Sequence, residues 1–287
     1  MERDLRKRIV EQFSGDGDRA DIWRGFGLCF DTDAYLNLGY SGRCQTHLLG
    51  EPQARLVSVV LTELASHQPA LAGSRLLDVG CGRGKPTVWA AERYGVDAIG
   101  VDLVSHNVRR AIRHADTSDR SPAFVLGDAA RLPLASDSVS ACVAVDSLVY
   151  VAEKADAFEE IGRVLEPGGH LVCSDLVVHD EAAVDGTVDR FGREWDMPAP
   201  PRFADYIATV EKGGLTVEGV RDLSPHSIGG FRKWSGLYLA LAEGPTAPAL
   251  ALLARGLDLD PGVITEQVRA AHEALPALHH VLVTASR

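Results

Sequence analysis

Short apolar runs alternate with helical patterns through the middle of the chain and predict a parallel sheet. The runs are typical of buried strands and fall at residues 75–79, 97–102, 123–126, 139–145 and 170–178. The segments between them carry apolar residues at helical spacing, at residues 87–93, 107–115 and 155–165. A Pro-Gly-Gly turn is expected at 167–169, before the fifth strand. This alternation predicts an α/β fold with helices on both faces of the sheet.

The two flanking regions follow other patterns. Residues 1–24 predict a polar helix, and residues 52–67 have the apolar spacing of a second helix. After residue 179 we expect a polar helical segment with a proline-rich kink, and then a strand, one long helix, a shorter helix and a closing strand, at 215–223, 231–254, after Pro261 and at 279–285. We predict that the last two strands pair at one end of the sheet. The inserted helices then cover its carboxyl edge, where α/β folds bind ligands.

Composition and charge exclude several classes of protein. The chain has 287 residues and a net charge of −11, so no basic surface for nucleic acid is indicated. The arginines near residue 6 alternate with acids, which is typical of a solvated helix face. No apolar run is long enough to span a membrane and no signal peptide is apparent, so we expect a cytoplasmic protein. The scattered cysteines favour reduced thiols over disulfides or a metal site, with Cys142 and Cys173 as core residues.

The glycine-rich segment LLDVGCGRGKP at 76–86 is the strongest functional signal. It joins a predicted strand to a predicted helix, and Gly80, Gly82 and Gly84 let the backbone turn sharply and approach a ligand closely. Main-chain amides at the start of the next helix favour a polar or anionic group. Asp102 ends the following strand, where an acid can accept both hydroxyls of a ribose. These residues predict a nucleoside-binding site.

Two nucleoside cofactors fit this pattern. Dinucleotide-binding loops usually carry a further glycine or alanine one step after the trio, where this chain has Lys85. Asp78 precedes the glycines, where a carboxylate can meet the ammonium group of S-adenosylmethionine (SAM), a group that NAD lacks. The pattern therefore favours SAM, and an NAD-dependent oxidoreductase is the alternative.

These residues resemble class I SAM-dependent methyltransferases, specifically the small-molecule, natural-product group that includes the rebeccamycin sugar O-methyltransferase and the related spinosyn cyclase. Besides the glycine loop, the resemblance is carried by GVDLVSHNVRRA at 100–111, GDAARLPLASDSVSACVAVDSL at 127–148 and RVLEPGGHLVCSD at 163–175. YLNLGYS at 35–41 resembles the family's lid over the cofactor. The resemblance implies a Rossmann-like class I methyltransferase fold with a seven-stranded, mostly parallel sheet and a helical cap insert. Its regions are N-terminal helices and lid (1–72), a SAM-binding core (73–178), and cap helices with the final strands (179–287).

The resemblance also implies roles in the cofactor site. Asp102 is expected to hold the ribose and Leu103 to stack on the adenine. Asp128 is expected to bind the adenine amino group, with Ala129 contributing its backbone amide. The full set expected to bind SAM, or its product S-adenosylhomocysteine (SAH), is Tyr35, Leu38, Gly39, Asp78, Gly80, Cys81, Gly82, Gly84, Asp102, Leu103, Asn107, Asp128, Ala129 and Asp146.

The residues for the chemical step depart from the family pattern. In methyl transfer the enzyme mainly positions the reactants and excludes water, and a base is needed only when the acceptor must lose a proton. The O-methyltransferases that this chain resembles have a His-His pair just after strand four. Here Val149 and Tyr150 take the place of that pair. Tyr150 suits an orienting hydroxyl better than a base, because the ordinary pKa of tyrosine is about 10. The family's acid at the end of strand five is present as Asp175, for which the candidate histidine partners are His47, His179 and His226.

The expected catalytic set is therefore Tyr150, Asp175 and His47. Aromatic residues of the last third are expected either to line a substrate pocket or to pack the cap onto the sheet. To the pocket we assign Tyr40, Val149, Trp195 and Trp234. The predicted function is SAM-dependent methyl transfer to a small natural-product-like molecule, with oxygen favoured as the acceptor atom. The alternatives are an N- or C-methyltransferase and a SAM-binding cyclase that methylates nothing. The expected partner is the small-molecule substrate, and a homodimer is compatible with the sequence.

Overall fold

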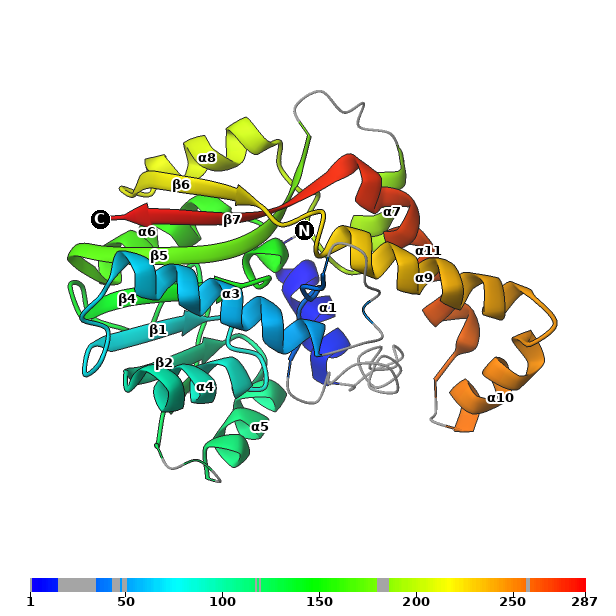
Figure 1. Cartoon of the computed structure of the whole chain (residues 1–287), viewed down its shortest axis with the longest axis horizontal. Helices are drawn as coiled ribbons and strands as arrows, with labels where there is room; N and C mark the ends of the chain where they lie inside the picture. Colours follow the sequence, from blue (N-terminus) through cyan, green and yellow to red (C-terminus); the bar gives the residue numbers. More distant parts are fainter. Residues whose placement is uncertain are drawn as a thin grey trace.

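The fold is built on one seven-stranded sheet with the order β3-β2-β1-β4-β5-β7-β6 (Figure 1). The computed structural model describes residues 2–14, 35–42, 47, 51–116, 118, 120–179, 186–256 and 259–287. The five strands that pair in parallel are β1 (Arg75–Val79), β2 (Asp97–Asp102), β3 (Ala123–Leu126), β4 (Val139–Val145) and β5 (Leu165–Val178). Strand β7 (Leu278–Ser286) is antiparallel to both β5 and β6 (Thr216–Asp222). The predicted mostly parallel sheet, with its last two strands paired at one end, is confirmed.

Helices bury both faces of this sheet. Along β4, alternate side chains point to opposite faces, as the geometry of a strand requires. Ala141 and Val143 pack in the cluster shared with α3 (Pro52–His67) and α4 (Lys85–Tyr94). Cys142 and Ala144 pack in the cluster shared with α6 (Lys154–Val164) and α8 (Phe203–Lys212). Because both faces are covered, the strand is apolar except for Ser140, and the prediction that Cys142 and Cys173 are core residues is confirmed.

A helical cap lies beyond the carboxyl ends of the parallel strands (Figure 1). Its elements are α1 (Glu2–Ser14), α7 (Gly186–Glu194), α9 (Ile228–Glu243), α10 (Ala247–Gly256), α11 (Pro261–Ala274) and the short segment η2 (Leu275–Ala277). An apolar cluster joins α1, α7, α9 and α11 to the residues that follow β2, β4 and β5. The cap therefore closes over the edge of the sheet at which the sequence predicts a ligand.

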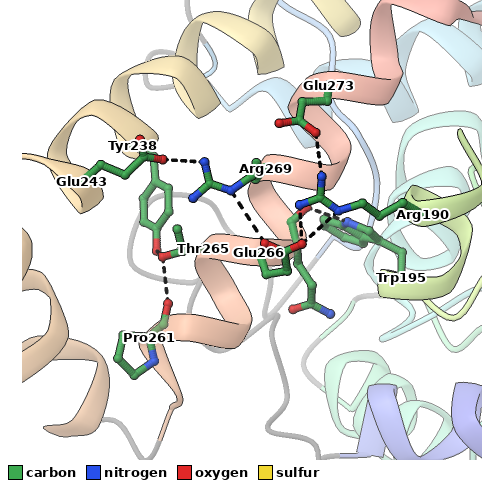
Figure 2. Close-up of polar contacts among 10 residues, drawn as sticks. Arg190, Trp195, Tyr238, Glu243, Pro261, Thr265, Glu266, Arg269 and Glu273 are labelled. Atoms are coloured by element: carbon green, nitrogen blue, oxygen red, sulfur yellow. Dashed lines mark hydrogen bonds and ion pairs between the residues drawn. The ribbon is translucent and has the colours of Figure 1, made fainter. Parts of the chain in front are cut away.

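Ion pairs on the outside of the cap hold its helices together (Figure 2). Arg190 of α7 contacts Glu266 and lies 2.7 Å from Glu273, both on α11. Arg269 of α11 reaches Glu243 of α9 at 2.7 Å. Exposed pairs of this kind contribute little singly, so we attribute most of the stability of the cap to its buried apolar cluster.

Two local predictions are wrong. The expected long helix at 231–254 is two helices, α9 and α10, whose axes differ by 103°. The break falls at Gly244 and Pro245, because a proline disfavours the helical conformation of the residue before it. The expected turn at 167–169 is part of β5, which pairs irregularly with β4 at this point. The helix predicted for residues 1–24 is present as α1 over Glu2–Ser14, and the rest of that prediction lies outside the described residues.

Among the described residues, no single helix is both long and apolar enough to cross a bilayer. Only the bent pair α9 and α10 meets that test, by length and composition alone.

Candidate functional site

The glycine loop follows β1 and passes so close to its neighbours that side chains cannot be accommodated. Gly80, Gly82 and Gly84 have φ angles of 69°, 53° and 83°, in the left-handed region that favours glycine. A Cβ atom on Gly80 would lie 2.3 Å from the Cβ of Ser147, and one on Gly84 would lie 2.5 Å from the Cβ of Ala111. The loop thus packs against the end of β4 and against α5 (Ser105–Ala115), and it turns the chain directly into α4.

Asp102 stands opposite this loop at the end of β2. Its carboxylate accepts hydrogen bonds from the amides of Gly82 (2.8 Å) and Val104 (2.9 Å) and from Nδ2 of Asn107 (3.2 Å). Burial raises the pKa of Asp102 to about 6, although these hydrogen bonds favour the charged form. The buried Oδ1 of Asn107 has no hydrogen-bond partner among the described residues. A carboxylate beside an unpaired amide oxygen suits the two hydroxyl donors of a ribose.

A cavity that is partly open to solvent joins the loop to the ends of β2, β3 and β4. Eight of the residues predicted to bind SAM are in its wall: Gly80, Gly82, Asp102, Leu103, Asn107, Asp128, Ala129 and Asp146. Its carboxylates, main-chain amides and apolar side chains together fit an aminoacyl nucleoside, which requires both polar and stacking contacts. We call this space the cofactor cavity.

The other residues predicted to bind SAM lie outside the cofactor cavity. Asp78 is buried behind the loop, where Thr87 donates a 2.6 Å hydrogen bond to it and burial raises its pKa to about 7. Cys81 is buried with its Sγ close to Gly100 of β2. The remaining four are Tyr35, Leu38, Gly39 and Gly84, of which Leu38 lines a second cavity and Gly84 packs on α5.

Helix α1 covers the cofactor cavity, which the sequence reasoning missed. Ile9 and Phe13 are buried in the wall of the cavity, and the ring of Phe13 meets that of Tyr150 edge-on at a centroid distance of 5.1 Å. Arg6 forms a 2.6 Å ion pair with Asp128, and Arg8 a 3.0 Å ion pair with Asp196 of the cap. The expected solvated face is therefore only part of α1. The available signal was the apolar pair at positions i and i+4 in an otherwise polar helix.

A second cavity lies between the cofactor cavity and the cap. Most of its lining is apolar, and the polar exceptions are Asn37, Gln53 and Asp146: the full set is Leu36, Asn37, Leu38, Gln53, Asp146, Val149, Tyr150, Leu176, Phe191, Trp195, Met197, Phe231, Ala271 and Leu275. It shares Leu36, Asp146 and Tyr150 with the cofactor cavity. We call it the apolar cavity. Its wall contains no lysine, arginine or histidine among the described residues, so it suits an uncharged molecule.

The residues predicted to bind substrate divide between this cavity and its surroundings. Val149 and Trp195 line the apolar cavity, and Nε1 of Trp195 donates a 3.0 Å hydrogen bond to the Gln267 carbonyl (Figure 2). Trp234 is buried beside Phe231 and Tyr238 in the cap but lines neither cavity. Tyr40 stacks on His226 at 4.5 Å and also lines neither.

Of the residues predicted for catalysis, only Tyr150 reaches the cavities. It lines both of them, and burial raises its pKa, which keeps the phenol protonated. Asp175 lines neither cavity, and its partner is Lys154 of α6 at 3.2 Å rather than a histidine. His47 also lines neither: its Nδ1 lies 2.7 Å from the Ser41 hydroxyl, and burial lowers its pKa to about 4. The ring of His179 lies next to that of His279 with the two planes tilted by 43°, and Nδ1 of His226 contacts the Ser41 carbonyl.

Asp146 is the acidic residue in the wall shared by the two cavities, at the end of β4. Its φ angle of 51° is uncommon for a residue with a side chain and marks a constrained position. Its Oδ2 accepts the Leu38 amide at 2.8 Å, and its Oδ1 accepts the Ser174 hydroxyl and lies 2.9 Å from Nε2 of His280. Burial alone would raise the pKa of Asp146, but His280, Ser174 and the Leu38 amide outweigh it and lower the pKa below the ordinary value. The sequence reasoning missed His280, which comes from the last strand.

Comparison with known proteins places this site in a family. Residues 77–173 match the family model described as a methyltransferase domain. The chain is 33% identical over 180 residues to methyltransferase GfsG of Streptomyces halstedii, an alignment that covers 61% of this chain and 64% of that protein. It is 30% identical over 185 residues to 27-O-demethylrifamycin SV methyltransferase of Amycolatopsis mediterranei, which covers 63% of this chain and 68% of that protein. The alignments thus span about two thirds of these relatives.

Solved structures show the same fold over nearly the whole chain. A geranyl diphosphate methyltransferase in complex with geranyl diphosphate and sinefungin superimposes with a TM-score of 0.75 and 19% identity, over 99% of each chain. The [4+2]-cyclase SpnF superimposes with a TM-score of 0.69 and 19% identity, over 93% of this chain and 94% of that one. At such identities the likeness shows the fold alone.

Proposed function

Because this chain belongs to the class I SAM-dependent methyltransferases, we propose that it transfers the methyl group of SAM to an oxygen atom of a small, mainly apolar, natural-product-type acceptor. The observation that carries the proposal is the shared wall between the polar cofactor cavity and the apolar cavity. Two molecules, one bound in each cavity, would meet at Leu36, Asp146 and Tyr150. Oxygen is supported by the name of the rifamycin relative, which acts at an O-27 position.

The cofactor cavity is suited to hold SAM, which supplies an electrophilic methyl group when it is bound. Asp102 and the Oδ1 atom of Asn107 would accept the ribose hydroxyls. Leu103 would pack against the adenine, near Asp128. Helix α1 would exclude water from this end of the cavity through Ile9 and Phe13. These residues bind and orient, and the reaction centre would lie at the other end, at the shared wall.

The apolar cavity supports an uncharged acceptor. A phosphate or diphosphate group needs cationic partners, and the described wall offers none. The protonated hydroxyl of Tyr150 would donate a hydrogen bond that orients the acceptor oxygen. The aromatic and aliphatic side chains would bury the rest of the molecule and exclude water from the reaction.

Isotope transfer tests the proposal directly. The protein is incubated with methyl-labelled SAM and a panel of uncharged hydroxyl compounds that includes 1-naphthol, a resorcinol and geraniol, with geranyl diphosphate as the charged counterpart of geraniol. We expect label in the products of uncharged members and a mass increase of one CH₂. Label in none of the products, although the protein binds SAM, would contradict the proposal. If NMR of the product shows the new methyl group on nitrogen or carbon, the assignment of oxygen as the acceptor atom is wrong.

A non-methylating cyclase is the second candidate. It is favoured by the position of Asp175 and His47 outside both cavities, which leaves the predicted base residues away from the reaction centre. An apolar cavity that holds a flexible polyene in a folded shape can accelerate ring closure by orientation alone. A product with the same mass as its substrate, formed without consumption of SAM, would favour this function over methyl transfer.

A further inference from the structure

The wall shared by the two cavities contains one side chain that can accept a proton from a bound hydroxyl during a reaction. Its three residues are Leu36, Tyr150 and Asp146. Leu36 has no ionisable group, and the raised pKa of Tyr150 makes that side chain a donor rather than an acceptor. Asp146 presents a carboxylate, and in the apolar cavity it is the only acid of the described wall.

Two buried side chains fix this carboxylate from behind. His280 is fully buried on β7, with Nε2 2.9 Å from Oδ1 of Asp146. Ser174 is fully buried on β5 and donates its hydroxyl to the same oxygen. Both partners therefore engage Oδ1, and Oδ2 accepts only the Leu38 amide at 2.8 Å among the described residues. A carboxylate oxygen has more than one acceptor site, so Oδ2 retains room for a second donor.

We propose that Asp146 is the general base for methyl transfer to a hydroxyl acceptor, and that His280 and Ser174 are positioning residues that keep its carboxylate charged and oriented at the shared wall. The inference rests on the proposed function. As the new C–O bond forms, the C–S bond to the methyl group breaks and its electron pair stays on sulfur. The hydroxyl proton passes to Oδ2 of Asp146 and is later released to solvent.

The other titratable groups near Asp146 and His280 are not placed to act as the general base. Tyr150 of η1 (Leu148–Tyr150) is held protonated, and Asp175 on β5 is directed to Lys154. His47 lies beyond Leu38, with its Nδ1 on Ser41. His280 lines neither cavity, so it can act on an acceptor only through Asp146.

Replacement of Asp146 tests the base. Asp146→Asn keeps the shape and cannot accept the proton, so we expect kcat for 1-naphthol, or for the panel member that is methylated fastest, to fall by about 10²-fold or more. Asp146→Glu restores a carboxylate and should recover part of the rate. The matched control is Asp222→Asn, because Asp222 also faces a histidine, His279 at 3.8 Å, but ends the edge strand β6, is half exposed and lines neither cavity. It should keep the parent kcat.

The pH profile tests the positioning residues. His280 and Ser174 lower the pKa of Asp146 against the effect of burial, so the charged base should persist to low pH in the parent. In His280→Gln the lowering charge is removed, and we expect the acid limb of kcat to move to higher pH by roughly one unit. Ser174→Ala should move it in the same direction and serves if His280→Gln does not fold. An acid limb that stays in place in both variants would overturn the role of these residues.

Acceptor binding gives a measurement that needs no turnover. The dissociation constant of 1-naphthol for the SAH-loaded protein, followed by naphthol fluorescence, should rise about tenfold in Asp146→Asn, because a hydrogen bond to a charged group is lost. It should not change in Asp222→Asn. If the parent methylates but Asp146→Asn keeps its kcat, its pH profile and its 1-naphthol affinity, the inference fails and the proposed function stands. If the parent transfers no label at all, the proposed function fails first.

Discussion

The two cavities meet at one wall but are built in different ways. The cofactor cavity is organised around the backbone of the glycine loop: Gly80 and Gly82 have positive φ and line it, the Gly82 amide faces Asp102, and the ends of neighbouring strands complete the wall. The apolar cavity is made of side chains from segments as distant as residues 36 and 275. The difference shows that a site fixed by local backbone geometry is visible in a short stretch of sequence, and a site assembled by tertiary packing is not.

The largest expected effect comes from a substitution in the glycine loop. Gly84→Ala places a methyl group 2.5 Å from Ala111 and 2.9 Å from Phe124 at a φ of 83°. We expect the free energy of unfolding to fall by about 3 kcal/mol, from overpacking together with left-handed strain. Gly73→Ala is the matched control, since its φ is 78° and its added methyl group meets nothing within 4 Å. Strain alone should cost it about 1 kcal/mol in urea unfolding. Equal losses would contradict the close approach of the loop to α5.

A smaller effect distinguishes a tryptophan that lines the apolar cavity from one that only packs inside the cap. Trp195→Phe removes the hydrogen bond to the Gln267 carbonyl and part of the wall of the apolar cavity. We expect a loss of about 1–2 kcal/mol of stability and a weaker affinity for 1-naphthol, with SAH affinity unchanged. Trp234→Phe, in the same apolar cluster but outside both cavities, should lose stability and keep its 1-naphthol affinity. If both variants bind 1-naphthol equally well, the assignment of Trp195 to the wall is wrong.

The smallest expected effect concerns pH. The pKa of Asp102 is raised to about 6 by burial, so its carboxylate is charged above that pH and protonated below it. The charged form accepts ribose hydroxyls more strongly, and SAH affinity should therefore fall about tenfold as the pH is lowered from about 7.5 to about 5. Calorimetric titration of SAH over this range measures it, and a flat profile would argue against Asp102 as the ribose acceptor.

The same raised pKa has a consequence for stability. A proton is bound more tightly to Asp102 in the folded state than in the unfolded chain, where the pKa is 3.8. The contribution of this group to stability is therefore full below pH about 4 and is lost as the pH rises through about 6. Bound SAH should offset part of this loss, because its hydroxyls stabilise the charged carboxylate.

The prediction of the fold from sequence succeeded where burial dictated the pattern. The bounds predicted for β1, β2, β3 and β4 match the structure, and the central strands β1 and β4 are buried along nearly their whole length. Strand β3 lies at the edge of the sheet and is largely exposed. The prediction failed at Gly244, where helical periodicity continues through a Gly-Pro step that breaks the helix. The first helix was misjudged because its buried face holds only two large apolar residues among many charges, Ile9 and Phe13.

The prediction of the site shows the same division. The carboxylate of Asp102 and the glycines lie in one strand–loop–helix–strand unit, in which the spacing is readable from the sequence. The pairing of Asp146 with His280 joins residues 134 positions apart through the order of β4, β5 and β7 in the sheet, which no local pattern encodes. Asp175 was expected at the end of strand five, but it lies within β5, which continues to Val178, and its side chain meets Lys154 of α6.

The central claim is that the carboxylate opposite the glycine loop binds the nucleoside. The most direct test is a calorimetric titration of SAH into the parent protein and into the Asp102→Asn and Asp97→Asn variants. Asp97 begins the strand that Asp102 ends, and its side chain is largely exposed. We expect Asp102→Asn to bind SAH about 10–100-fold more weakly than the parent, since hydrogen bonds to a charged acceptor are lost. Asp97→Asn should bind as the parent does. A parent that does not bind SAH, or an Asp102→Asn variant that binds it equally tightly, would contradict the account.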